Sequence, residues 1–131
     1  MKIVKFEDFQ TWGGWENFCF LKITTDEGIV GWAEFNEARG RKGLTGLIHS
    51  LGEGLIGEDP RNTAKIDAML YGQTRSTTGG LQSHASAAII NACLDIKGKA
   101  LGVPVYQLLG GAIRDRLPVY WSHCGFFRAD R

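Results

Sequence analysis

Two short segments of this chain carry side chains suited to holding a small ligand. In the first, Thr11–Glu16 (TWGGWE), Trp12 and Trp15 flank two glycines. Aromatic rings on a short glycine-containing loop can close over a ligand and exclude water. They can equally pack against a helical layer or a subunit interface. The residue types alone leave both interpretations open.

The second segment, Asn36–Gly43 (NEARGRKG), is a polar loop that concentrates positive charge. Arg39, Arg41 and Lys42 fall within four positions. A guanidinium offers a carboxylate two parallel hydrogen bonds, so this spacing suits recognition of a carboxylate ligand. A solvated run of charges is the alternative interpretation.

Four carboxylates, Asp26, Glu27, Glu34 and Glu37, lie close together in sequence. A magnesium site needs carboxylate oxygens that converge on one point. Asp26 and Glu27 fall in a predicted turn, and Glu34 is expected a strand length away. We therefore expect these side chains to serve turns and strand ends rather than a metal ion.

Charge and composition exclude several classes of protein. The chain has 131 residues, 15 basic against 14 acidic, and a net charge of +1, which argues against nucleic-acid or anionic membrane binding. No apolar run approaches the ~20 residues that span a bilayer. Three widely spaced cysteines, Cys19, Cys93 and Cys124, predict neither a disulfide framework nor a zinc site. We expect a single globular unit in a reducing cytoplasm.

The first third of the chain has the pattern of strands. Ile3–Gln10, Asn17–Thr25 and Gly28–Phe35 are rich in aromatic and β-branched residues, and Thr25–Gly28 (TDEG) supplies turn residues. The short connections predict a three-stranded antiparallel meander.

Helices follow from residue 44 onward. Apolar residues recur at helical spacing from Leu44 to Leu55, which predicts a helix that ends at Gly57. Asp59 suits an N-cap and Pro60 a first helical position, so a second helix is predicted to begin there.

The longest predicted helix runs from Leu81 to Leu101, with Gly102 as its C-cap and Pro104 preventing continuation. It is apolar over so wide an arc that we expect it to pack on several neighbours. Leu117–Ser122 is predicted to form a further strand. Strands followed by helices predict an α+β fold, a meander and then a helical bundle.

Three motifs in this order resemble a known family. They are Asp95–Gly111 (DIKGKALGVPVYQLLGG), Thr25–Glu34 (TDEGIVGWAE) and Gly57–Pro60 (GEDP). Together they resemble the N-terminal capping domain of the mandelate racemase/muconate lactonizing branch of the enolase superfamily, over nearly the whole chain. The resemblance implies a capping domain at residues 1–116 and the start of a truncated (β/α)-barrel at residues 117–131, with Leu117–Ser122 as its first strand.

In that family two loops of the capping domain close over the substrate, and here they correspond to Thr11–Glu16 and Asn36–Gly43. Ends of barrel strands face the active site, so in a complete barrel the end of this predicted strand would face the substrate. The resemblance therefore implies specificity roles, rather than catalytic ones, for five residues: Trp12, Trp15, Arg39, Arg41 and His123.

The family's chemistry is abstraction of a proton α to a carboxylate, with a magnesium ion holding the enediolate, followed by dehydration or racemisation of substrates such as acid sugars. The metal ligands and bases lie on later barrel strands, which this sequence does not contain. We therefore expect no metal binding and no catalysis by this chain alone. Lys97 and Lys99 imitate a Lys-x-Lys base motif, but they fall near a helix C-terminus, where positive charge is favoured.

A stand-alone binding or assembly module is the alternative function. An unpaired strand followed by Gly125–Arg131 (GFFRADR) could pair with another copy, and Phe126 and Phe127 could cover an apolar surface. Both hypotheses are compatible with a homo-oligomer.

Overall fold

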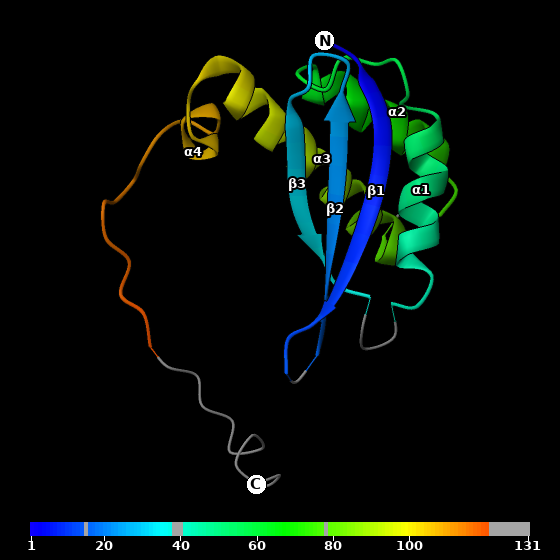
Figure 1. Ribbon diagram of the computed structural model, residues 1–131, viewed down its shortest axis with the longest axis horizontal. Coiled ribbons are helices and arrows are strands. Elements are labelled where there is room, and N and C mark those ends of the chain that lie inside the picture. The colour runs from blue at the N-terminus through cyan, green and yellow to red at the C-terminus, as the bar shows by residue number, and fades with distance from the viewer. Residues whose placement is uncertain (15, 38–40, 78, 121–131) are drawn as a thin grey trace, which may run out of the picture.

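One three-stranded sheet, covered on one face by helices, makes up the body of the molecule (Figure 1). The computed structural model describes residues 1–14, 16–37, 41–77 and 79–120. No helix within these ranges is long and apolar enough to cross a membrane. The predicted α+β architecture, a meander followed by helices, is confirmed.

The strands are β1 (Ile3–Trp12), β2 (Asn17–Thr25) and β3 (Val30–Phe35), antiparallel in the order β1-β2-β3. The bounds predicted for β2 are confirmed. β1 runs two residues further than predicted, because Trp12 still pairs with Asn17, and the turn closes where the Gly13 N–H donates to the Glu16 carbonyl at 2.9 Å.

Strand β3 starts two residues later than predicted. The Ile29 carbonyl accepts from both the backbone N–H (3.0 Å) and the hydroxyl (2.9 Å) of Thr25, so the turn extends to Ile29. Gly28, at φ 80°, takes the left-handed conformation inside this turn. The turn predicted at Thr25–Gly28 is thus confirmed, and the hydrogen bonds from Thr25 to Ile29 extend the turn by one residue.

Alternation along the strands builds the core. In β2 the buried side chains are every second residue, from Cys19 to Thr25, and in β3 they are Ala33 and Phe35, with buried Gly31 between the sheet and a helix. The buried face meets apolar side chains of the helices, which makes one continuous cluster. Cys19 and Cys93 belong to this cluster as free thiols, and burial raises the pKa of Cys93 to about 12, so packing is their role.

The helices are α1 (Leu44–Glu53), α2 (Thr63–Thr74), α3 (Gly80–Leu101) and the single turn α4 (Val105–Leu108). Helix α1 ends at Glu53, four residues before the predicted end at Gly57. Within it, Gly52 lies against the ring of Phe6, where a Cβ would be 2.9 Å from a ring carbon. That glycine therefore allows the close packing of α1 on β1.

The prediction that the second helix begins at Asp59 and Pro60 is wrong. The Asp59 carboxylate accepts from the backbone N–H and the guanidinium of Arg61, which fixes a turn instead. Asn62 then precedes the helix, and Thr63 is its first residue. Asp59 therefore does not cap a helix, because its carboxylate instead accepts hydrogen bonds from Arg61, two residues further on.

Helix α3 is the centre of the fold, as its wide apolar arc predicted. It packs against β2, β3 and the three other helices, and its fully buried positions include Ala85, Ile89 and Ile96. Gly102 ends it in the left-handed conformation at φ 67°, with its N–H bonded back to the last turn, which confirms the predicted C-cap.

The segment after α4 leaves the body of the protein and extends away from it without regular structure to Tyr120 (Figure 1). The predicted strand Leu117–Ser122 is not formed over residues 117–120, which are exposed. A strand needs hydrogen bonds from a neighbouring strand, and none of the described residues offers one there. Residues 121 and 122 lie outside the described part.

Candidate functional site

The two predicted ligand loops lie at the same end of the sheet (Figure 1). β1 ends and β2 begins there, so the turn at residues 13–16 projects from that end. β3 ends there as well, and the connection from Asn36 to Gly43 leads from it into α1. An antiparallel meander of this order necessarily brings both connections to one edge of the molecule.

Trp12 closes β1 beside the first turn and is 66% exposed. The interpretation that it packs on the helical layer is therefore wrong, and its ring is free to meet a ligand or another surface. Trp15, its predicted companion, lies outside the described residues.

Glu37 holds the second loop in place. Its carboxylate accepts from the backbone N–H of Gly43 at 2.8 Å and from the hydroxyl of Thr45 at 2.6 Å. These hydrogen bonds, the Thr45 hydroxyl first, hold the pKa of Glu37 below its ordinary value. Glu37 therefore has the local structural role that its position predicted.

A hollow of about 370 Å³ lies between the two loops. Gln10, Glu16 and Asn17 line it from the β1–β2 hairpin, and Glu37 and Lys42 line it from the second loop. The two loops therefore border a common space, and Lys42 brings one positive charge to it.

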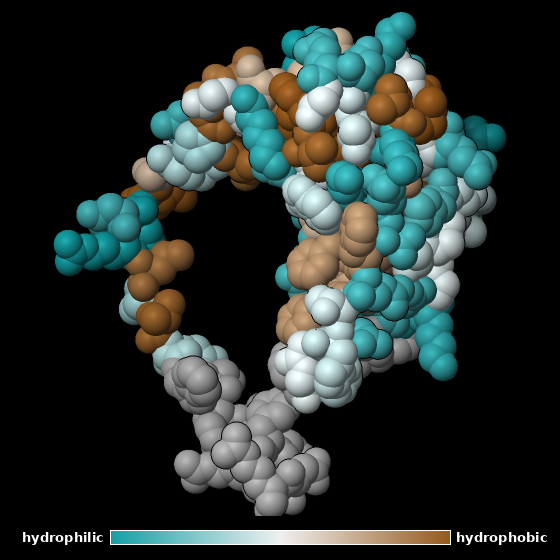
Figure 2. Space-filling model, in the orientation of Figure 1, coloured by the Kyte–Doolittle hydropathy of each residue, from teal (hydrophilic) through white to brown (hydrophobic). Residues whose placement is uncertain are grey.

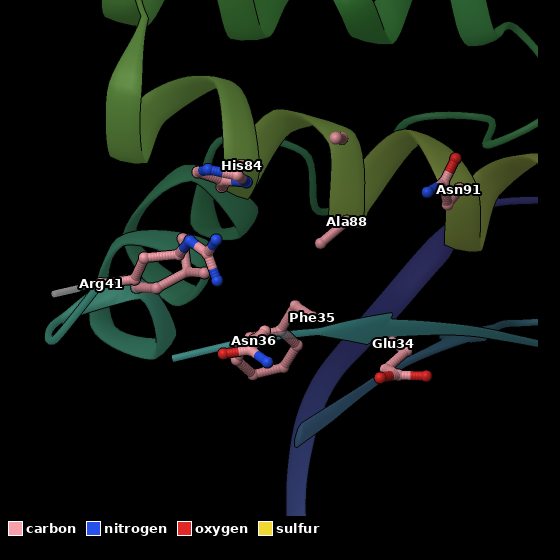
Figure 3. Close-up of a pocket in the computed structure, with 9 residues that line it drawn as sticks. Glu34, Phe35, Asn36, Arg41, His84, Ala88 and Asn91 are labelled. Carbon is pink, nitrogen blue, oxygen red and sulfur yellow. The ribbon is translucent and has the colours of Figure 1, made fainter. Parts of the chain in front are cut away.

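Arg41 borders a second cavity, of about 290 Å³, between the end of β3, the start of α1 and the face of α3 (Figure 3). His84 and Asn91 of α3 border this cavity. Glu34 of β3 also borders it, but its exposed side chain projects from the face of the strand opposite α3 (Figure 3). Of the predicted cationic loop residues, Arg41 thus lies at a cavity, whereas Arg39 lies outside the described residues, as does His123 in the C-terminal segment.

The carboxylates that are close in sequence are dispersed in space. Asp26 accepts from the Lys2 backbone N–H at 2.7 Å, and Glu27 pairs with the Met1 amino group at 2.7 Å, both at the turn between β2 and β3. That turn lies at the opposite end of the sheet from Glu37. Among the described residues, no three His, Cys, Asp or Glu side chains are grouped so as to hold a metal ion.

Lys99 is committed to a structural contact. Its ammonium donates to the Val30 carbonyl at 2.8 Å and pairs with Asp95 at 2.6 Å. This confirms the structural interpretation of Lys99 over the base motif.

His84, Asn91 and the cavity role of Glu34 were not predicted from the sequence. A helix polar at positions 84 and 91 gives no signal by itself. The relevant signal is the four-residue spacing of Asn91, Asp95 and Lys99 on one face of α3, which acquires meaning only when that face lies along β3.

The family model described as "Mandelate racemase / muconate lactonizing enzyme, N-terminal domain" matches residues 10–110. The chain belongs to this family. Its fold agrees with that assignment, since a solved structure from Burkholderia xenovorans strain LB400 superposes with a TM-score of 0.91 at 49% identity, over 97% of this chain. That protein, provisionally named L-alanine-DL-glutamate epimerase, was crystallised with magnesium and fumarate bound.

Two further relatives show the range of named activities. D-Galactonate dehydratase from Variovorax paradoxus is 45% identical over 121 residues, which is 92% of this chain and 31% of that protein. The 3,6-anhydro-D-galactonate cycloisomerase from Zobellia galactanivorans superposes at a TM-score of 0.77 with 30% identity, over 85% of this chain and 32% of that one. The Burkholderia match covers 32% of its chain, so this chain spans about a third of the length of each relative.

Proposed function

We propose that this chain is the substrate-covering domain of a magnesium-dependent enzyme that abstracts the proton α to the carboxylate of an acid sugar. The observation that carries the proposal is the meeting of two loops at one end of the sheet, with exposed Trp12 in one and Arg41 in the other. Names among the relatives, D-galactonate dehydratase in particular, support the substrate class.

The chemistry divides between this chain and a catalytic part. Relatives are about three times as long as this chain, and our proposal places the metal ligands and the base in a barrel domain within that further length. Magnesium, when bound there, supplies positive charge for the developing enediolate. The relative crystallised with magnesium supports this assignment of the metal.

The residues of this chain act on binding and on access of water. Arg41 offers the substrate a charge-assisted, bidentate contact. Trp12 places an apolar ring at the closing edge, where exclusion of water strengthens every polar interaction beneath it. Arg39, Trp15 and His123 belong to the same proposal as further specificity residues.

A chimaera tests this function. Residues 1–110 would replace the corresponding domain of the Variovorax D-galactonate dehydratase, and kcat and KM for D-galactonate would be measured with Mg²⁺. We expect dehydration, and we expect Arg41→Ala to raise KM by about 10- to 100-fold, because a hydrogen bond to a charged group contributes about 1.5–3 kcal/mol.

Arg75→Ala, an exposed cation just past α2, is the matched control and should leave KM unchanged. A chimaera that folds and binds Mg²⁺ but leaves D-galactonate and other acid sugars unreacted would contradict the proposal. Equal KM values for the Arg41 and Arg75 variants would show that Arg41 does not contribute to substrate binding.

Self-association is the second candidate function. The C-terminal segment exposes large apolar side chains, with Ile113 97%, Val119 90% and Tyr120 87% exposed, and the brown side chains along it are visible in Figure 2. Exposed apolar surface of this kind favours burial against a partner. Sedimentation of the 131-residue chain across micromolar concentrations should show a dimer or larger species, and a monomer throughout would exclude this candidate.

A further inference from the structure

The outer edge of β3 is closed by side chains of α3. The backbone N–H of Trp32 donates to the Asp95 carboxylate at 2.8 Å. The Lys99 ammonium donates to the Val30 carbonyl at 2.8 Å. Unpaired backbone groups at a sheet edge are a template for pairing with another chain, so these contacts protect β3 from such pairing. The opposite edge of the sheet belongs to β1 (Figure 1).

The edge of β1 is closed only at its start. The Ile3 N–H donates to the Glu58 carbonyl, and the Ile3 carbonyl accepts from the Gly57 N–H, each at 2.9 Å. The connection between α1 and α2 therefore occupies the position of a neighbouring strand at this one residue. Along the described part of the chain, no comparable contact follows further along β1.

The pairing of β1 with β2 shows which backbone groups remain open. The hydrogen bond from Gly13 to Glu16 makes these two residues a hydrogen-bonded pair. Hydrogen-bonded pairs alternate along antiparallel strands, so every second residue before Gly13 directs its N–H and C=O away from β2. These residues are Phe6, Asp8, Gln10 and Trp12. Within the described residues, no hydrogen bond reaches their outward backbone groups.

The side chains along this open edge do not oppose a further strand. Glu7 is paired with Lys5 at 2.7 Å, and Asp8 with His49 of α1 at 2.7 Å, so both carboxylates have partners within the chain. The remainder of the edge, Phe9–Trp12 (FQTW), carries no charge. Natural sheets commonly protect an exposed edge with unpaired charges, and this stretch has none.

Exposed aromatic rings accompany the open backbone groups. Phe9 is 45% exposed, and Trp12 is still more exposed. The Phe9 ring lies 5.5 Å from the ring of Trp32 on the outer face of the sheet, and this contact leaves nearly half of each residue in water. Aromatic side chains that face each other across neighbouring strands stabilise the pairing of those strands. A strand added beside β1 would therefore cover apolar surface as well as backbone groups.

We propose that the open edge of β1 pairs antiparallel with the β1 edge of a second copy of this chain, so that the two sheets become one continuous sheet across a two-fold axis. A two-fold contact requires a surface that is complementary to itself, and β1 meets this requirement in one register. The inference goes beyond the proposed function, because it involves neither the substrate nor the metal. It also concerns a surface other than the C-terminal segment.

The chemistry of opposing side chains selects the register. Outward-directed residues must face outward-directed residues, so the axis passes beside a single residue of β1. An axis at Glu7 or Asp8 would place two carboxylates opposite each other, which is destabilising. An axis at Gln10 would place Asp8 opposite the Trp12 ring. An axis at Phe9 brings the two Phe9 rings together and places each Gln10 amide opposite Asp8 of the other copy, so this register is the one we propose.

Substitutions at Gln10 test both the surface and the register. One strand pair buries less area than a standard interface, so we expect a weak dimer with a dissociation constant on the order of 100 µM. Sedimentation equilibrium of the 131-residue chain from about 10 µM to about 1 mM covers this range. Gln10→Lys, facing Asp8, should tighten the dimer at least about fivefold, and Gln10→Glu should weaken it at least about fivefold, since each dimer contains two such pairs.

Matched controls carry the same charges elsewhere. Gln10 is exposed, so neither substitution disturbs the core. Gln107 is exposed on α4, and Gln107→Lys and Gln107→Glu should associate as the unmodified chain does. An axis at Gln10 would place two like charges together in both Gln10 variants, so both would then dimerise more weakly. Opposite effects of the two substitutions are therefore specific to the axis at Phe9.

Disulfide formation tests the register by geometry. Across an axis at Phe9, two Phe9→Cys residues form a non-hydrogen-bonded pair with Cα atoms about 4.5 Å apart, which a disulfide can span. Two Thr11→Cys residues would be four positions apart along the strands, roughly 13 Å, which a disulfide cannot span. Cys19 and Cys93 are buried, and a Cys124→Ser background removes the remaining native thiol. We expect the Phe9→Cys protein to form disulfide-linked dimers at least about tenfold faster than the Thr11→Cys protein.

A monomer at every concentration would overturn the inference. So would equal association of the Gln10→Lys and Gln10→Glu proteins, or equal rates of disulfide formation at positions 9 and 11. Association that neither Gln10 substitution changes would assign the contact to another surface, such as the C-terminal segment, and exclude β1. None of these results depends on the activity of the chimaera, so the inference and the proposed function can fail separately.

Discussion

Substituting Gly31 by Ala should separate α3 from the sheet. Gly31 is buried in β3, directly beneath the helix. A Cβ at this position would lie well inside contact distance of the Ala92 carbonyl oxygen and 2.6 Å from the Ile96 Cγ1. Ile96 could change rotamer, but the carbonyl belongs to the helix backbone and cannot move alone. The whole helix must therefore shift outward.

The size of the effect follows from that shift. Overpacking in a core costs about 1–3 kcal/mol, and a clash with backbone falls at the upper end, so we expect a loss of about 3 kcal/mol. With an m value of about 2 kcal/mol/M, the urea midpoint should fall by about 1.5 M. The shift would also strain the contacts of Asp95 and Lys99 with the edge of β3.

Urea unfolding followed by circular dichroism at 222 nm measures this loss. Gly46→Ala is the matched control, because Gly46 lies within α1 and a Cβ added there would have no neighbouring atom within 4 Å. That change should stabilise the protein by about 0.5–1 kcal/mol. An unchanged midpoint for Gly31→Ala would refute the argument that close approach of α3 requires this glycine.

Two further predictions concern hydrogen bonds at the surface. Asp95→Ala should make the amide hydrogen of Trp32 exchange about tenfold faster, because this amide loses its acceptor at 2.8 Å. The lost hydrogen bond corresponds to about 1–2 kcal/mol. Unchanged exchange would show that Asp95 does not protect this edge of β3. Arg61→Gln should raise the pKa of Asp59, which the guanidinium lowers from 3.8 to about 2, as ¹³C carboxyl titration would report. Because the folded-state pKa of Asp59 is depressed, its contribution is present above about pH 4 and is lost as the pH falls toward 2. Because the Asp59–Arg61 pair is exposed, the Arg61→Gln variant should be less stable than the parent at neutral pH by at most about 1 kcal/mol. Below about pH 2 the two proteins should be equally stable. A difference in stability that persists below that pH would contradict the proposed linkage.

Local patterns predicted the elements wherever one signal dominated. β2 has the predicted bounds because its alternation and its turns agree, and α3 has its predicted end because Gly102 can adopt the left-handed conformation that stops it. The second helix was misplaced because Asp59 had two competing uses, as a cap and as the partner of Arg61. Propensity cannot choose between them, since the choice depends on where the Arg61 side chain lies.

The candidate site was predicted in part. The loop containing Arg41 was identified from its charges, and Trp12 from its place beside glycines, since residue type and loop position are properties of the sequence. His84 and Asn91 were missed because an isolated polar residue on a helix is usually solvated. Their significance comes from the strand that lies beside them.

The sequence by itself determined the succession of strands and helices, the near-neutral charge and the loops that carry Trp12 and Arg41. These depend on periods of two and 3.6 residues and on turn chemistry, which act over a few neighbours. Tertiary structure decided which groups meet. Trp32 bonds with Asp95 from 63 residues away, and Lys99 reaches Val30 across 69, because a glycine lets the helix approach the sheet. Contacts over such separations are set by packing of the whole core, which no local pattern specifies.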